Sequence, residues 1–298
     1  MANLKEIRTR IVSVSSMSQI TNAMKMVSAA KFKKAQDNIL QMRPYANKLQ
    51  EILYTLSSND SSSSDNPYVR SGTSQMVLVV VITSNRGLCG AFNTNVIKLA
   101  LQTVNEKYSQ QLAAGNVFFL PIGKKASDFF TKRKYQVLPG NYNHLLDGTS
   151  FEKIVPTVQM VIDAFLDGTY AKIEVIYNQF KNAAVQITTH EPFLPLETAS
   201  LKQNKDVPKT LHHDFIFEPS KAEIIKELIP KILKIQILKA ILDSVAAEHG
   251  ARMTAMHKAT DNATELVKGL RLQYNKARQA SITNEILEIV GGAEALRK

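Results

Sequence analysis

The longest pattern in the chain is a repeat of apolar and small residues over residues 219–298. From Ile235 to Leu287 these residues recur at alternating spacings of three and four, which is the heptad pattern of a coiled-coil helix. A helix of some 75 residues would reach ~110 Å at ~1.5 Å per residue, so a partner helix is expected beside it. The seam is polar in places, and its predicted positions are Ile235, Leu238, Leu242, Val245, His249, Arg252, Met256, Ala259, Ala263, Leu266, Leu270, Gln273, Ala277, Ala280, Asn284 and Leu287.

A second long helix is predicted for residues 1–56, where four blocks of apolar residues keep the same spacing with register shifts between them. We expect Pro44 to kink this helix or to leave a short gap. In the C-terminal helix we expect a bend or a break near Ile229, just before Pro230. Ser220 is a candidate N-cap of that helix. The predicted seam of the N-terminal helix is Leu4, Ile7, Ile11, Val14, Met17, Ile20, Met24, Val27, Phe32, Ala35, Ile39, Met42, Tyr45, Leu49, Ile52 and Leu56.

Between the two helices, the pattern changes to alternating strands and helices. A Ser-rich loop over 57–74 leads into an α/β domain over 75–200, and 201–218 connects it to the C-terminal helix, with irregular structure expected from 192 onward. The fold class is therefore α/β plus a long antiparallel coiled coil, with N- and C-terminal helices flanking an inserted Rossmann-like domain. Strands are expected at 75–83, 116–122, 135–138, 173–180 and 184–189, the last two as a hairpin, and helices at 91–108, 124–132 and 151–166.

The two helices differ in length, and this difference predicts an exposed end. Antiparallel pairing would place Leu4 beside roughly Leu272, so that about two dozen C-terminal residues lack a partner in this chain. That overhang still carries large apolar side chains, which a lone helix would expose to water. We therefore expect it to dock into another protein or to self-associate. The residues expected to carry this contact are Ile282, Ile286, Leu287 and Val290.

The formal net charge is +11, and most of it lies on the two helices. Residues 1–56 hold nine basic and three acidic residues, and 219–298 hold 13 basic and nine acidic residues. A basic coiled coil attracts nucleic acid, anionic lipid or an acidic protein surface, although the charges also suit a solvated helix face. Few aromatic residues accompany them to stack on bases. A basic coiled-coil nucleic-acid-binding protein stays open as an alternative.

Other sequence signals limit compartment and membrane placement. No apolar run approaches the ~20 residues of a membrane-spanning helix, and the first residues form no hydrophobic signal core. The one cysteine, Cys89, excludes an internal disulfide and suits a reducing compartment.

Candidate catalytic and metal sites are weak. The segment Gly87–Gly90 follows a strand and opens a helix, as phosphate-binding loops do, but it lacks the Gly-Lys-Ser/Thr of a P-loop, so a structural turn is favoured over a nucleotide-dependent enzyme. Cys89 beside Arg86 suits either a reactive thiol or a buried, inert one. The pairs His212-His213 and His257/Asp261 favour surface residues over metal ligands. We expect no enzyme activity, no cofactor and no metal.

Several motifs resemble those of one family, the bacterial-type gamma subunit of F-type ATP synthases. They are residues 20–31 (ITNAMKMVSAAK), 86–90 (RGLCG), 259–263 (ATDNA) and 274–285 (YNKARQASITNE). The order of helix, α/β domain and helix also resembles that of the family. Asn22 and Asn85 depart from the residues that the family commonly has there.

The resemblance implies a non-catalytic rotor shaft at the cytoplasmic face of the bacterial inner membrane. Its coiled coil would turn inside a hexamer of alternating alpha and beta subunits, whose beta subunits carry the catalytic sites. Its α/β domain would sit on the c-subunit ring beside the epsilon subunit, and ion flow would drive the ring. The matching positions for contact with an acidic beta-subunit loop and for bracing the shaft are Met24, Lys25, Arg252, Gln279 and Thr283.

Overall fold

The structure is a computed structural model that describes residues 4–58, 67–69, 74–196 and 221–295. The chain forms two compact units. The helical unit comprises Met1–Ala29 and Arg252–Lys298, and the sheet unit comprises Ala30–Ala251. Two long helices, α1 (Leu4–Ser58) and α6 (Lys221–Ala295), each contribute residues to both units.

Neither proline interrupts its long helix. Pro44 lies inside the 55 residues of α1, and Pro230 lies inside the 75 residues of α6. Of the expected alternatives, the gap at Pro44 and the break near Ile229 are therefore wrong, while the kink at Pro44 and the bend near Ile229 stay predictions. Buried neighbours explain the continuity, because Ala46 and Ile229 are both packed in the core of the sheet unit, and tertiary packing outweighs local propensity. The candidate cap Ser220 lies outside the described residues.

The sheet unit is built on a five-stranded sheet of order β3-β2-β1-β4-β5. Strand β1 pairs in parallel with β2 and β4, β2 pairs in parallel with β3, and β4 pairs antiparallel with β5. The predicted α/β fold with an antiparallel edge strand is confirmed. The strands are β1 (Val77–Ile82), β2 (Val117–Ile122), β3 (Gln136–Val137), β4 (Lys172–Phe180) and β5 (Gln186–Leu194).

The edge strand β5 differs most from the sequence-based expectation. It begins at Gln186 and continues to Leu194, so the irregular structure expected from residue 192 onward does not start there. Pro192 is tolerated within the strand because an edge strand has one side that needs no ladder hydrogen bond.

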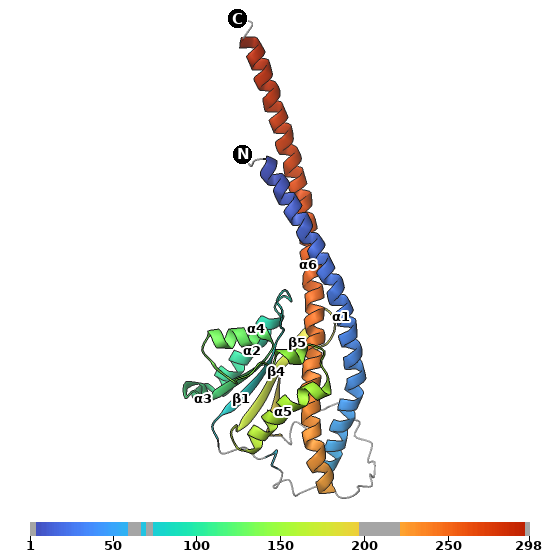
Figure 1. The fold of residues 1–298 in the computed structure, drawn as a ribbon, viewed down its shortest axis with the longest axis vertical. Helices are drawn as coiled ribbons and strands as arrows, with labels where there is room; N and C mark the ends of the chain where they lie inside the picture. Colours follow the sequence, from blue (N-terminus) through green and yellow to red (C-terminus); the bar gives the residue numbers. More distant parts are fainter. Residues whose placement is uncertain (1–3, 59–66, 70–73, 197–220, 296–298) are drawn as a thin grey trace. The chain divides into compact units, whose positions relative to one another are not determined.

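Helices cover both faces of the sheet (Figure 1). On one face α2 and α4 bury Val79, Val96 and Phe130 with their neighbours. On the other face α5 packs with the sheet-unit portions of α1 and α6 around Val80, Ile162 and related side chains. The short helices α3 and η2 were not anticipated. The helices are α2 (Phe92–Lys107), α3 (Ser109–Ala113), α4 (Lys124–Lys132), η2 (Asn143–Leu146) and α5 (Phe151–Leu166).

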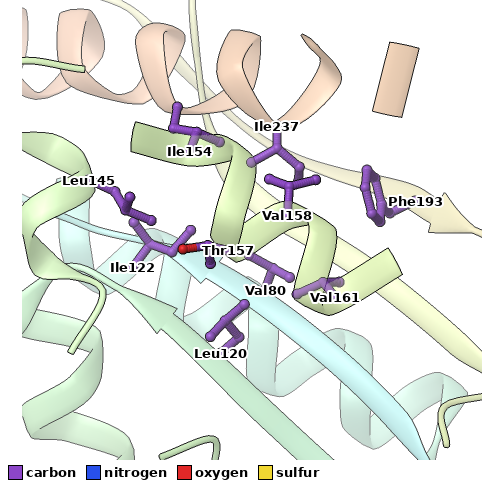
Figure 2. A pocket seen from close by; sticks show the side chains of 10 residues that line it. All are labelled: Val80, Leu120, Ile122, Leu145, Ile154, Thr157, Val158, Val161, Phe193 and Ile237. Atoms are coloured by element: carbon purple, nitrogen blue, oxygen red, sulfur yellow. The ribbon is translucent and has the colours of Figure 1, made fainter. Parts of the chain in front are cut away.

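A small cavity of about 10 Å³ remains where the sheet, α5 and α6 meet (Figure 2). Among the described residues that line it, Thr157 alone has a polar side chain. A water molecule needs at least this volume together with two or more polar partners, so the cavity is a packing void and not a ligand site. It is lined by Val80, Leu120, Ile122, Leu145, Ile154, Thr157, Val158, Val161, Phe193 and Ile237.

Candidate functional site: the exposed surface of the helical unit

In the helical unit, α1 and α6 pair in antiparallel directions (Figure 1). Thr21 Oγ1 and Thr260 Oγ1 lie 2.8 Å apart and form a hydrogen bond across the pair. In an antiparallel pair a step forward on one helix matches a step back on the other, which places Leu4 opposite about residue 277. The predicted partner, Leu272, lies about one and a half turns away from that position. The described residues beyond this point have no α1 residue beside them.

The seam between the helices is lined partly by small hydroxyl residues. Ser28 is buried and donates from Oγ to the Met24 carbonyl at 2.7 Å. Thr260 donates to the Met256 carbonyl at 2.8 Å. Each hydroxyl is satisfied by its own helix, so the seam gains close packing without leaving buried polar groups unpaired.

Part of the predicted seam is wrong. Met17, Ile20 and Val27 on α1 point to solvent, and on α6 Leu266 is 48% exposed while Val267 is half-buried. The reason is that a helix of 3.6 residues per turn drifts against a strict heptad repeat, and the drift moves the buried stripe by one position.

The exposed apolar residues of α1 form a surface that we name the outer face. Exposed large apolar groups that gather together mark interaction surfaces in soluble proteins. These side chains are between 57% and 61% exposed, so α6 does not cover them. The outer face consists of Val12, Met17, Ile20, Met26 and Val27.

A second exposed apolar surface lies near the end of α6, and we name it the tip. Its side chains are between 47% and 71% exposed. At 100° per residue they form a stripe ~160° wide, with Asn284 and Glu288 on the opposite side. The exposure agrees with the sequence pattern, while the docking role stays a prediction. The tip consists of Ile282, Ile286, Leu287, Ile289 and Val290.

The residues singled out by resemblance occupy different environments. Met24 and Lys25 are half-buried beside the seam, and Arg252 is buried in it. Gln279 and Thr283 are exposed on one face of α6, where Thr283 Oγ1 donates to the Gln279 carbonyl at 2.9 Å. The structure therefore brings the last two together, and their contact role stays a prediction.

The Gly-containing loop of the sheet unit is a closed turn. Cys89 is 2% exposed, and the Asn93 side-chain amide donates to its Sγ at 3.2 Å. The Asn93 side-chain oxygen accepts from the Ser84 backbone N–H at 2.9 Å. Leu88 has a positive φ of 64°, in keeping with a tight turn. The buried cysteine agrees with the inert alternative.

The candidate metal pairs gain no support within the described part of the chain. His257 Nδ1 and Asp261 Oδ2 lie 3.4 Å apart on an exposed helix face. No group of three or more His, Cys, Asp or Glu side chains is arranged to hold a metal ion in the described residues. His212 and His213 lie outside those residues.

Sequence reasoning missed two buried polar clusters in the sheet unit. In the first, the Glu174 carboxylate accepts hydrogen bonds from Tyr108 and His190. Burial alone would raise the pKa of Glu174, but these hydrogen bonds, with the charges of His190 and Lys107, hold it below its usual value. The sequence contained one indication of this cluster, namely a single acidic residue within the apolar strand β4.

The second cluster joins three elements. Arg43 of α1 forms an ion pair with Asp243 of α6 at 3.2 Å. It also donates to the carbonyl of Phe180, the last residue of β4, at 2.9 Å. A lone acid in the apolar stretch of α6 was again the available signal, but its partner lies 200 residues away in sequence.

Among the described residues, no helix combines the length and the apolar character that a membrane span requires.

The family follows from comparison with known proteins. A protein-family model described as ATP synthase matches residues 3–296. An ATP synthase gamma chain from Flavobacterium psychrophilum is 57% identical over 297 residues, which cover 100% of both chains. The chain belongs to the ATP synthase gamma chain family. Gamma chains from Christiangramia forsetii (55% over 296 residues, 99% of both chains) and Geobacter metallireducens (42% over 297 residues, 100% of both chains) are also similar.

Solved structures agree on the fold of this gamma chain family member. A chain of the Euglena gracilis mitochondrial ATP synthase, described as OSCP/F1/c-ring in rotational state 3, matches with a TM-score of 0.67 at 22% identity and covers 98% of this chain and 94% of that one. A rotor chain of the same enzyme in rotational state 1 matches with a TM-score of 0.62 at 20% identity, covering 94% and 98%. The family resemblance is confirmed, and nothing in these comparisons supports the nucleic-acid-binding alternative.

Proposed function

We propose that this chain is the central-stalk rotor subunit of an F-type ATP synthase. It couples ion-driven rotation of a c-subunit ring to conformational cycling of the catalytic beta subunits, and it contributes no catalytic residue itself. The single observation that carries this proposal is the exposed apolar tip of α6 in a member of the gamma chain family.

The tip has a sizeable free energy to gain from a partner. Complete burial of an exposed Ile, Leu or Val side chain is worth about 1.5–3 kcal/mol. The five tip residues are about half exposed, so an apolar sleeve around them would contribute about 5 kcal/mol in total. That is enough to hold a helix end in place without locking it irreversibly.

The one-sided apolar stripe also suits a rotor. Its apolar side would meet a different subunit of an alpha–beta hexamer at each rotational position. Asn284 and Glu288, on the opposite side, would then face the other subunits of the hexamer. A shaft that binds one subunit conformation better than another shifts that subunit's population as it turns. The outer face of α1 offers a second asymmetric contact.

Charge gives a further basis for subunit contact. We assign Met24 and Lys25 a contact with an acidic loop of the beta subunit. Arg252, Gln279 and Thr283 of α6 would brace the shaft or take part in that contact. Complementary charge favours encounter and register more than raw affinity, which suits a contact that is made and released in every turn. Since Arg252 is buried, it acts by bracing the seam and not by direct contact.

The remaining partners follow from the same function. We place the sheet unit on the c-subunit ring, beside the epsilon subunit, at the cytoplasmic face of the bacterial inner membrane. The protein would be peripheral there and would associate with the membrane through the complex.

Truncation after Tyr274 tests the proposal, because it removes the tip and leaves the sheet unit intact. We expect the affinity for the alpha–beta hexamer to fall by about three orders of magnitude, as measured by co-purification at graded concentrations, because about 5 kcal/mol of apolar contact is lost. The thermal unfolding of the sheet unit should not change.

Point variants sharpen this test. Ile286→Asp with Leu287→Asp should reproduce the loss, whereas the control Leu166→Asp, at an exposed apolar site on α5, should not. A truncated chain that assembles and couples as well as the intact chain would rule out docking through the tip.

A further inference from the structure

The turn between β4 and β5 is held by both long helices within the sheet unit. Arg43 of α1 donates one hydrogen bond to the Phe180 carbonyl, where β4 ends, at 2.9 Å. The same Nη2 atom lies 3.2 Å from Asp243 Oδ1 of α6. One side chain therefore connects α1, α6 and the sheet.

Further contacts connect the same turn with both helices. The rings of Phe32 on α1 and Phe180 pack edge to face, with 5.5 Å between their centroids. Gly250 of α6 passes so close to the turn that an added Cβ would lie 3.0 Å from the Ala183 carbonyl oxygen and 3.4 Å from the Phe32 ring. A larger residue at position 250 would push against Ala183 and Phe32, so glycine is the residue that allows α6 to lie this close to the turn.

The turn itself is fixed in shape. The Asn182 side-chain oxygen accepts from the backbone N–H groups of Ala184 at 3.0 Å and Val185 at 2.7 Å. The Asn182 N–H in turn donates to the Val185 carbonyl at 3.3 Å. We name this turn, together with Phe32, Arg43, Asp243 and Gly250, the hairpin clasp.

Asp243 is the buried member of the ion pair in the clasp, whereas the Arg43 side chain is 37% exposed. The Asp243 side chain is 0% exposed, and within the described residues its Oδ2 makes no hydrogen bond. Burial raises the pKa of Asp243, and the neighbouring Arg43 only partly opposes that effect. Apolar residues of similar volume would often stabilise such a site at least as well. They would not hold the turn and the two helices in one defined relative position. Directional hydrogen bonds resist sliding, whereas apolar contacts are non-directional.

We propose that the hairpin clasp is the linkage through which the sheet and the adjoining segments of α1 and α6 turn as one body under torque. Arg43 and Gly250 are its positioning residues, because one pins the turn to both helices and the other lets α6 approach it. This inference rests on the proposed rotor function, and it names the part of the rotor that carries load between the sheet and the helices.

Single-molecule rotation of the assembled complex tests the linkage. The hexamer is fixed to a surface, and a probe is attached through Lys98→Cys, an exposed position on α2. The width of the probe's angular distribution during catalytic pauses reports torsional stiffness. We expect the angular variance to rise at least twofold in Arg43→Gln and in Gly250→Ala, with the ATP hydrolysis rate within twofold of the parent.

Matched controls separate this role from simple folding. Lys33→Gln removes an exposed charge from α1, and Gly269→Ala adds a methyl group to α6 where nothing lies within 4 Å. Both should leave the variance unchanged. Arg43→Lys, which keeps the charge but replaces the planar guanidinium with a flexible ammonium group, should assemble fully and give an intermediate variance.

An unchanged variance in Arg43→Lys, Arg43→Gln and Gly250→Ala would overturn the linkage. A probe that never rotates on the parent complex would instead overturn the proposed function, so the two failures are distinguishable.

Discussion

At the residue scale, the most informative side chain is Glu174. Its folded-state pKa lies below the usual value of 4.5, although burial opposes this shift, because Tyr108, His190 and Lys107 stabilise its charged form. A carboxyl group with a lowered folded pKa contributes stability that is present above its unfolded pKa. That contribution is lost as the pH falls through the folded value.

Glu174→Gln should therefore lower the free energy of unfolding by about 2 kcal/mol at pH 7, the typical worth of hydrogen bonds to a buried charged group. The difference from the parent should shrink as the pH falls through the folded pKa of Glu174, because the parent then loses the charge as well. Chemical unfolding at pH 7 and at an acidic pH measures both effects.

The matched control is Glu106→Gln on α2. The Glu106 carboxylate is exposed and accepts a hydrogen bond from the Gln102 side chain. Exposed substitutions of this type usually change stability by less than about 0.5 kcal/mol. A loss of stability in Glu174→Gln that is equal at both pH values would contradict the role of its charge.

The partners of these buried acids could not be predicted from the sequence. Glu174 and Asp243 are visible in the sequence as lone acids in apolar runs. Their partners Tyr108 and Arg43 lie 66 and 200 residues away, and only the folded chain brings them together. No local pattern encodes such a pairing.

At the element scale, the heptad and strand patterns predicted almost every long element. The existence of α1 and α6 follows from apolar periodicity sustained over many turns. Their buried faces were predicted less well, because a one-position drift moved Ile20 and Leu266 from the predicted seam to the surface. The sequence left open whether each helix continues through Pro44 and Pro230, because tertiary packing can override local helix propensity.

Helix propensity gives a prediction for α6. Gly269→Ala should stabilise the helical unit by about 1 kcal/mol, since glycine is that much less favourable than alanine inside a helix and the site is open. Hydrogen exchange of the neighbouring backbone amides measures the gain.

The comparison variant is Gly250→Ala on the same helix. The same propensity gain is opposed there by the contact with Ala183, so we expect a smaller gain or a loss of stability. Equal stabilisation at both sites would show that the close approach at Gly250 has no cost.

At the scale of the whole molecule, the fold class follows from the order of patterns along the chain, and the family follows from its motifs and relatives. The tip was predictable for a physical reason: the helix that continues past its partner still carries large apolar residues. The outer face of α1 was not predicted, because the heptad pattern assigned three of its residues, Met17, Ile20 and Val27, to the seam.

The central claim is that this chain turns inside a hexamer of alpha and beta subunits. The most direct measurement fixes that hexamer to a surface, attaches a probe to the sheet unit through Lys98→Cys and supplies ATP. We predict unidirectional rotation in steps that repeat with the symmetry of the hexamer. A probe that stays still while the complex hydrolyses ATP at its normal rate would contradict the claim.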